Sequence, residues 1–195
     1  MQQNQVLLLW RKTRSYCLHI VVILTKKNHI VIRRLFYLTN TRPDINHAVH
    51  FLSQFMQSPN QNHHRAINRV LRYIKASLAR GIFFPYENDI QLKALSDSYW
   101  AFCDLTRKST TGCCIYIGAS LVSWKTKKQN IVSHSSSKAE YRALATTVCK
   151  LQWLTFLLRD LQVDAVTPAN LYCDNQVARH IVMNHVFHER TIYCF

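Results

Sequence analysis

The sequence predicts an α/β fold in which a meander of short strands, a long helix and one further strand contribute to a single sheet. Short apolar runs bounded by turn residues occur at residues 92–97, 113–117, 121–124 and 170–173. Between the third and fourth runs, one helix face is formed by Glu140, Leu144, Thr147, Leu151, Leu154 and Leu158. A chain of 195 residues with 48% hydrophobic content can bury a core around these elements, as one domain or one domain plus a fragment.

The first 43 residues form a basic stretch that has eight Lys or Arg and no acidic residue. This stretch resembles an import presequence only in charge, because the order of basic, apolar and small residues that a secretory signal requires is missing. We leave residues 1–30 as an unassigned basic leader. We expect a cytoplasmic or nuclear protein, with mitochondrial import as the alternative.

Two helices are expected next along the chain. Thr41, Pro43 and Asp44 form a helix-start signal, which predicts a helix that ends near Ser58. A second helix is expected over residues 63–75, where apolar residues recur at helical spacing.

The polar side of this second helix carries a basic stripe. Arg65, Arg69 and Arg72 are spaced four and three residues apart, so they lie along one face. The stripe is either a solvated charged face or a track for nucleic-acid phosphates, since no acidic residue lies among the three.

Residues 81–86 form an aromatic connector, and we place a domain boundary there. After the first strand, the polar loop at residues 106–112 carries Arg107 and Lys108. Lys125, Lys127 and Lys128 come directly after the strand that ends at Trp124. We therefore expect a cluster of cations at an edge of the sheet.

Three of the ten acidic residues lie at the ends of predicted elements. Asp97 ends the first strand, Asp174 follows the fourth strand, and Glu140 lies in the first turn of the long helix. If the two strands are neighbours and the helix crosses them, the three carboxylates meet at one edge of the sheet. Such a meeting is what a divalent metal site for phosphodiester chemistry requires.

Two of these acids also have a purely structural interpretation. Ser137 and Glu140 have the spacing of a capping box, in which the Glu side chain bonds back to the cap amide. Asp174 has the position of an N-terminal cap for the helix that follows it. Glu140, however, is in line with the core-facing leucines, a direction that capping does not explain.

The formal net charge of +15 indicates attraction to polyanions, either nucleic acid or an anionic membrane. Nucleic acid is favoured, because no apolar run approaches the roughly 18 residues of a membrane span. The seven cysteines include no C-x-x-C pair, so a disulfide framework and a zinc ribbon are both disfavoured, and a reducing compartment is the simplest interpretation. His180, His185 and His188, near Cys173 and Cys194, fit no zinc-binding spacing.

The order of the acids discriminates between related chemistries. Integrase-type cores place two aspartates before the helical glutamate, whereas here the glutamate comes second, which is the ribonuclease H order.

The sequence resembles the Pol polyprotein of copia-type LTR retrotransposons, from the end of reverse transcriptase into the ribonuclease H region. The resemblance is carried by RLFYLT at 34–39, TRPDI at 41–45, LSQFM at 52–56, RVLRY at 69–73, TRKSTTG at 106–112, SWK at 123–125, KKQ at 127–129, AEYRAL at 139–144, YCDNQ at 172–176 and HERT at 188–191.

This resemblance implies a ribonuclease H-like mixed sheet, with three antiparallel strands plus a parallel fourth, after two reverse-transcriptase-derived helices. A remnant of reverse transcriptase would occupy residues 31–86, and a ribonuclease H-like domain residues 87–195. The implied activity is hydrolysis of RNA in RNA/DNA hybrids with two Mg²⁺ or Mn²⁺ ions. The implied catalytic metal ligands are Asp97, Glu140 and Asp174.

The implied partners are nucleic acid and other Pol subunits, with no membrane. The basic side chains expected to hold the nucleic-acid backbone are Arg65, Arg69, Arg72, Arg107, Lys108, Lys125, Lys127 and Lys128.

The sequence also departs from the family pattern. A fourth aspartate normally follows the HERT motif, but the chain ends at Phe195, so the last strand and helix are expected to be missing. Tyr99 stands where the family usually has an acid, and Lys138 replaces a common acid before Glu140. We therefore expect an impaired enzyme. The alternative is a non-catalytic, basic nucleic-acid-binding remnant of Pol.

Overall fold

The computed structural model describes residues 28–103 and 105–184, and it divides between Ile82 and Phe83 into two compact units. The basic leader up to residue 27, together with His185, His188 and Cys194, lies outside the described residues. Each unit has its own buried cluster of apolar side chains. Among the described residues, no helix combines the length and the apolar composition that a membrane crossing requires.

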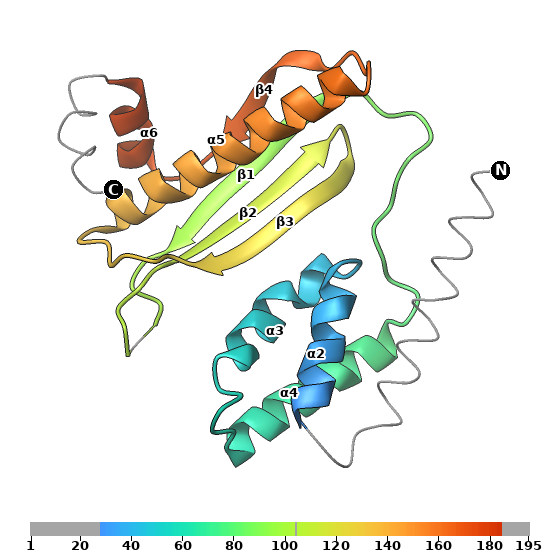
Figure 1. Cartoon of the computed structure of the whole chain (residues 1–195), viewed down its shortest axis with the longest axis vertical. Coiled ribbons are helices and arrows are strands. Elements are labelled where there is room, and N and C mark those ends of the chain that lie inside the picture. Colours follow the sequence, from blue (N-terminus) through green and yellow to red (C-terminus); the bar gives the residue numbers. More distant parts are fainter. Residues whose placement is uncertain (1–27, 104, 185–195) are drawn as a thin grey trace. The chain divides into compact units, whose positions relative to one another are not determined.

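The first unit consists of helices (Figure 1): α2 (Asn28–Thr39), the short 3₁₀ helix η1 (Pro43–Ile45), α3 (Asn46–Ser53) and α4 (Gln61–Ala76). Leu35 of α2, Val49 of α3 and Ile74 of α4 are almost fully buried in one cluster. We did not predict α2, which has no acidic residue in its first turn and no basic residue in its last. Its stability comes from packing rather than from terminal signals.

The predicted helix from Thr41 to near Ser58 is wrong at both ends. The Thr41 hydroxyl donates to the Leu38 carbonyl at 3.3 Å, so it closes the end of α2 instead of capping the next helix. Arg42 takes the cap position without a side-chain cap bond, and α3 ends at Ser53. Arg42 is instead buried, at 1% exposure, against the Asp44 carboxylate.

The second unit is built on a four-stranded sheet (Figure 1) of β1 (Gln91–Tyr99), β2 (Thr110–Ile117), β3 (Ser120–Lys128) and β4 (Val166–Tyr172). The strand order is β3-β2-β1-β4, with β1, β2 and β3 antiparallel and β4 parallel to β1. The predicted combination of an antiparallel meander with a parallel fourth strand is therefore confirmed. Helix α5 (Ser136–Asp160) crosses one face of the sheet, and α6 (Gln176–Met183) follows β4.

The core of this unit lies between α5 and the sheet. Leu92 and Ala94 alternate toward the helix on β1, and Ile115 does so on β2. From α5, the buried residues include Leu151 and Leu154. The predicted helical stripe is thus confirmed as the face that packs on the sheet.

All four strands are longer than predicted. β1 runs from Gln91 to Tyr99, so Asp97 lies within the strand and the prediction that it ends the strand is wrong. β2 begins at Thr110, and β3 continues to Lys128, because their polar residues still pair across the ladder. β4 begins at Val166, four residues before the predicted start at 170, and includes Pro168. The proline is tolerated because β4 is an edge strand with a register shift in its pairing to β1.

Candidate metal centre

Two of the three predicted acids lie at the same end of neighbouring strands. Leu95 of β1 pairs with Tyr172 of the parallel strand β4. Asp97 and Asp174 each come two residues after this pair, so the backbone brings them to one end of the sheet. Both side chains are exposed there.

Glu140 reaches the same place from α5. The helix begins at Ser136, so Glu140 lies in its second turn, and our placement in the first turn is wrong. The cap is Ser135, whose side chain accepts from the Lys138 amide, so the capping box of Ser137 and Glu140 is also wrong. Glu140 is only 5% exposed, because it points into the sheet.

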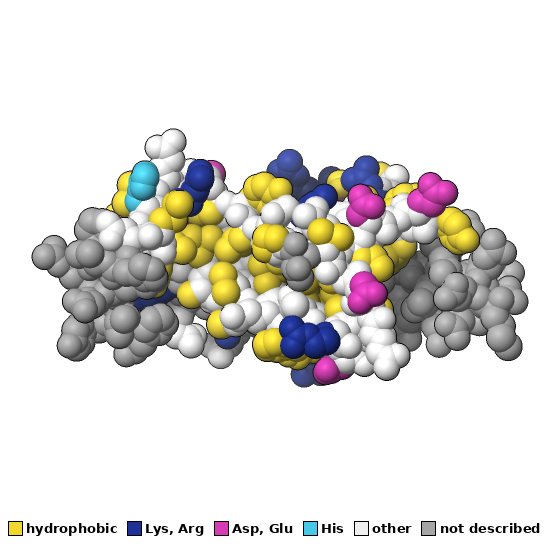
Figure 2. Space-filling view, turned by 90° about the horizontal axis from the view of Figure 1, so that it is seen from above, with side chains coloured by type: hydrophobic (Ala, Val, Ile, Leu, Met, Phe, Trp, Pro, Cys, Tyr) yellow, Lys and Arg dark blue, Asp and Glu magenta, His cyan; other side chains and the backbone are white. Residues whose placement is uncertain are grey.

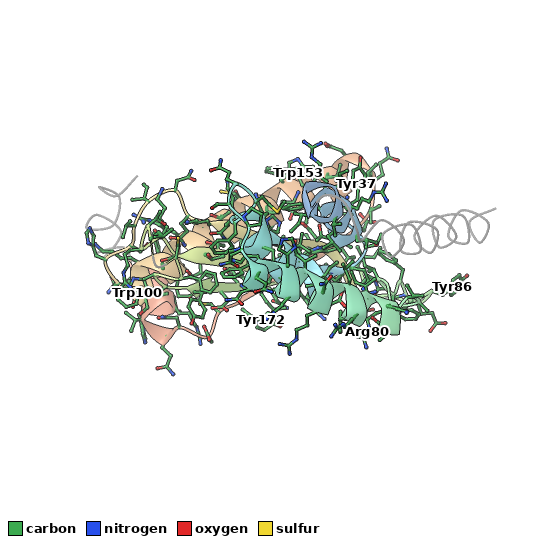
Figure 3. All side chains as sticks on the ribbon, turned by 90° about the horizontal axis from the view of Figure 1, so that it is seen from below. Tyr37, Arg80, Tyr86, Trp100, Trp153 and Tyr172 are labelled. Atoms are coloured by element: carbon green, nitrogen blue, oxygen red, sulfur yellow. The ribbon has the colours of Figure 1, made fainter. Side chains whose placement is uncertain are left out.

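One backbone amide joins two of the carboxylates. Ser98 N donates to Glu140 Oε1 at 2.8 Å and to Asp97 Oδ1 at 2.6 Å. Trp100, labelled in Figure 3, links the end of β1 to the start of α5, because its Nε1 donates to the carbonyl of Ser133, just before α5, at 2.9 Å. The Thr147 hydroxyl of α5 also bonds the Ser96 hydroxyl of β1, at 3.1 Å.

Asp174 is not the cap of α6, so that alternative is wrong. Asn175 takes the cap position, and its side chain accepts from the Ala178 amide at 2.9 Å. The Asp174 carboxylate therefore does not cap the helix and instead belongs to the acid cluster. The donor atoms of Glu140, Cys173 and Asp174 lie within 4.8 Å of one another.

Cys173 is a member of this cluster that sequence reasoning missed. Its thiol points to Glu140 Oε2, with 4.0 Å between the sulfur and the oxygen. Strand alternation would have placed it on the face opposite to Asp174. The departure arises because β4 ends at Tyr172, so Cys173 no longer follows the strand geometry.

Burial and the negative charges of Asp97 and Asp174 together raise the pKa of Glu140 to about 7, although the hydrogen bond from the Ser98 amide acts in the opposite direction. Crowded carboxylates of this kind are relieved by a divalent cation. The carboxylate oxygens of Glu140 and Asp174 are donors of the kind that a hard ion such as Mg²⁺ takes, and the Cys173 thiol lies with them. Asp97 is not in this group of close donor atoms, and it is joined to Glu140 through the Ser98 amide.

Comparison with known proteins identifies relatives among mobile elements. The chain is 42% identical over 160 residues to the Retrovirus-related Pol polyprotein from transposon RE1 of Arabidopsis thaliana, covering 82% of this chain and 11% of that protein. It is 32% identical over 157 residues to the corresponding TNT 1-94 polyprotein of Nicotiana tabacum, covering 80% of this chain and 12% of that protein. The chain belongs to the copia-type retrotransposon Pol family.

The chain thus spans about a ninth of these Pol polyproteins, 11% and 12% of their lengths. A third relative is the Secreted RxLR effector protein 161 of Plasmopara viticola, which is 37% identical over 125 residues, 64% of this chain and 88% of that protein. No family model and no solved structure matches the chain.

In this Pol segment, the predicted cations of the sheet form part of the edge strand β3. Lys125, Lys127 and Lys128 lie within the strand, so our placement of them after it is wrong, although the edge position is confirmed. Lys125 and Lys127 are exposed, whereas Lys128 Nζ contacts Cys103 Sγ at 2.8 Å. This ammonium group lowers the pKa of Cys103 to about 7.

The remaining predicted cations lie in the loop after β1 and on helix α4. Arg107 is exposed in the loop after β1 and has a positive φ of 52°, and Lys108 beside it is half-buried. Arg65, Arg69 and Arg72 are all exposed on α4, opposite its buried apolar side, which confirms one solvent-facing stripe. Figure 2 shows Lys and Arg side chains at several places on one face of the molecule, interspersed with hydrophobic side chains.

Proposed function

We propose that this Pol segment hydrolyses the RNA strand of RNA/DNA hybrids, as a ribonuclease H-like domain that follows a remnant of reverse transcriptase. The observation that carries the proposal is the shared Ser98 amide, which holds Asp97 and Glu140 together. The parallel pairing of β1 with β4 adds Asp174 at the same end of the sheet.

The chemistry follows from the charge of the substrate. A phosphodiester repels nucleophiles, and bound divalent cations supply charge neutralisation and an activated water. The chain contributes carboxylates that are fixed by a strand end and a packed helix, which gives the required rigidity. The 2′-hydroxyl of RNA provides the feature by which such a site distinguishes RNA from DNA.

Cleavage of a labelled RNA/DNA hybrid by the full chain, with Mg²⁺ or Mn²⁺, tests this proposal. We expect RNA cleavage that EDTA abolishes, and a loss of about 10³-fold or more in Asp97→Asn, because one metal-holding carboxylate is removed. The matched control is Asp160→Asn, the same change at the exposed end of α5, which should cleave like the unmodified chain. Equal cleavage by the unmodified chain and Asp97→Asn would refute the proposal.

A second candidate function is binding of nucleic acid without cleavage. It is favoured by the net charge of +15 and by Tyr99, an exposed aromatic residue at the end of β1 where the family usually has an acid. In the same experiment, hybrid binding by the unmodified chain, with no cleavage in either metal, would select this function.

A further inference from the structure

A basic groove lies between the edge strand β3 and helix α5, and it has a volume of about 250 Å³. Its lining side chains come from β2, β3, α5 and the segment that joins β3 to α5, and none of them is acidic. The lining residues used below are Thr111, Cys113, Lys125, Lys127, Gln129 and Arg142.

The strand register explains why these groups share one surface. Thr111 pairs with Lys127, and Cys113 pairs with Lys125. Alternate residues of a strand point to the same face, and Ile115, two residues further along, is buried under α5. The two lysines therefore lie on the side of the sheet that α5 covers, beyond the edge of its apolar core.

Helix α5 and the preceding segment complete the groove. Arg142 Nη1 donates to the Ser133 hydroxyl at 3.0 Å, and that hydroxyl donates to Gln129 Oε1 at 3.2 Å. Gln129 Nε2 donates in turn to Thr111 Oγ1 and to the Ala139 carbonyl, each at 3.0 Å. One end of the groove is thus held by a hydrogen-bond network rather than by loose side chains.

The charge of the groove favours an anion with several acceptor oxygens. Four basic residues line one concave surface that has no carboxylate in its lining: Lys125, Lys127, Lys128 and Arg142. A phosphate group accepts hydrogen bonds from Lys and Arg at the same time, and a concave surface strengthens the attraction.

The same network reaches the carboxylate cluster. Gln129 Nε2 also lies 3.4 Å from the Ser98 hydroxyl, and the amide of Ser98 holds Asp97 and Glu140. A phosphate in the groove would therefore be held by residues that are rigidly connected to the site of proposed hydrolysis.

We propose that this groove binds a phosphate group, supplied either by a nucleic-acid backbone or by a free polyphosphate. The nucleic-acid source rests on the proposed function, in which the groove would hold a phosphate away from the scissile bond. Arg142 joins Lys125 and Lys127 as a ligand, which extends the set of basic residues that the sequence indicated. Gln129 positions Arg142 through the Ser133 hydroxyl.

Neighbouring cysteines allow a direct test by thiol footprinting of the full chain in EDTA, where no hydrolysis occurs. Cys113 lines the groove, Cys114 alternates to the opposite face of β2, and Cys149 is exposed on α5. N-ethylmaleimide labelling would be followed by mass spectrometry with an RNA/DNA hybrid or with tripolyphosphate. We expect at least fivefold slower labelling of Cys113, with Cys114 and Cys149 unchanged.

Protection by the hybrid alone would assign the phosphate to nucleic acid, and protection by tripolyphosphate alone would assign it to a free anion. Unchanged Cys113 labelling with both probes, at concentrations that saturate their binding, would overturn the proposal. Asp97→Asn should retain the protection of Cys113. The loss of hydrolysis and the loss of phosphate binding in the groove are therefore measured separately.

Substitutions of the groove provide a second measurement. Lys125→Gln and Arg142→Gln should each raise the Kd for the hybrid about tenfold. Each should also reduce the slope of log K against log salt by about 0.9, the value for one phosphate contact. The control is Arg159→Gln, which removes one charge from the same helix about 25 Å away along its axis. Equal effects of the control and the groove variants would contradict a specific phosphate site.

Discussion

At the scale of single residues, the buried carboxylate of Glu140 serves the proposed function, but its charge should lower the stability of the fold. Its pKa is raised to about 7 by burial and by the nearby negative charges of Asp97 and Asp174, from an ordinary value of 4.5. Between these pH values, the folded chain binds a proton that the unfolded chain has released. The free energy of unfolding of the metal-free protein should therefore fall as pH rises from about 4.5 to 7.

Glu140→Gln should remove this penalty, because the amide keeps an acceptor for the Ser98 N–H without a charge. In EDTA at pH 8, urea unfolding should show the variant to be more stable than the unmodified chain by about 1–3 kcal/mol. At pH 4.5 the gap should be smaller. A gap that is equal at both pH values would show that charge at Glu140 is not the cause.

Cys103 should be the most reactive of the cysteines that the structure describes. The contact with Lys128 Nζ favours its thiolate and lowers its pKa to about 7, from an ordinary value of 9.0. The rate of alkylation by iodoacetamide, measured by mass spectrometry, should rise with pH through a midpoint near 7. In Lys128→Met the midpoint should move up toward 9, whereas the rate at which the exposed Cys149 is alkylated should be the same in both proteins. An unmoved Cys103 midpoint would exclude the lysine as its cause.

At the scale of elements, the turn between β2 and β3 depends on one glycine. Gly118 has a φ of 57°, and a Cβ added there would collide with the Asn88 side chain and the Asp89 carbonyl. Asn88 itself fixes the turn, since it donates to the Ile117 carbonyl and accepts from the Ala119 amide, each at 2.8 Å.

Gly118→Ala should therefore destabilise the second unit by about 1–3 kcal/mol, as strain at the positive φ adds to the steric clash. Gly81→Ala is the matched control, because no atom lies within 4 Å of its added Cβ. Urea midpoints measured by circular dichroism would compare the two variants. Comparable midpoints would mean that the turn accommodates a side chain.

Element type followed from periodicity, but element ends did not. The long apolar stripe of α5 could be predicted because every turn of the helix repeats the signal. Its cap could not, since Ser135, Ser136 and Ser137 are chemically equivalent candidates. The bond between the Ser98 amide and Glu140 lies between residues 42 positions apart, and no local pattern reveals it.

The candidate site, like the fold, could be predicted only in part from the sequence. Acids at strand ends indicated Asp97 and Asp174, because neighbouring parallel strands bring their ends together. Cys173 was missed because it lies just past the end of β4. Arg142 was missed because the groove exists only once the register of β2 with β3 is known.

At the scale of the whole molecule, two separate cores carry basic surfaces that belong to different units. The α4 stripe lies in the first unit, and the groove and the acid cluster lie in the second. With a net charge of +15, both surfaces should attract polyanions, but only the second unit holds the carboxylates. Binding and hydrolysis should therefore be separable by substitution.

Replacing Arg65, Arg69 and Arg72 together by Gln should test this separation. Their exposure makes a folding defect unexpected, and each lost phosphate contact should lower the slope of log K against log salt by about 0.9. Hybrid affinity should fall, while the cleavage rate at saturating hybrid and low salt should stay within about twofold, because the stripe belongs to a different unit from the acid cluster. A fall in that saturated rate as large as the fall in affinity would mean that the α4 stripe acts on the reacting phosphate itself. In that case the first unit would be part of the catalytic site rather than an independent contact for nucleic acid.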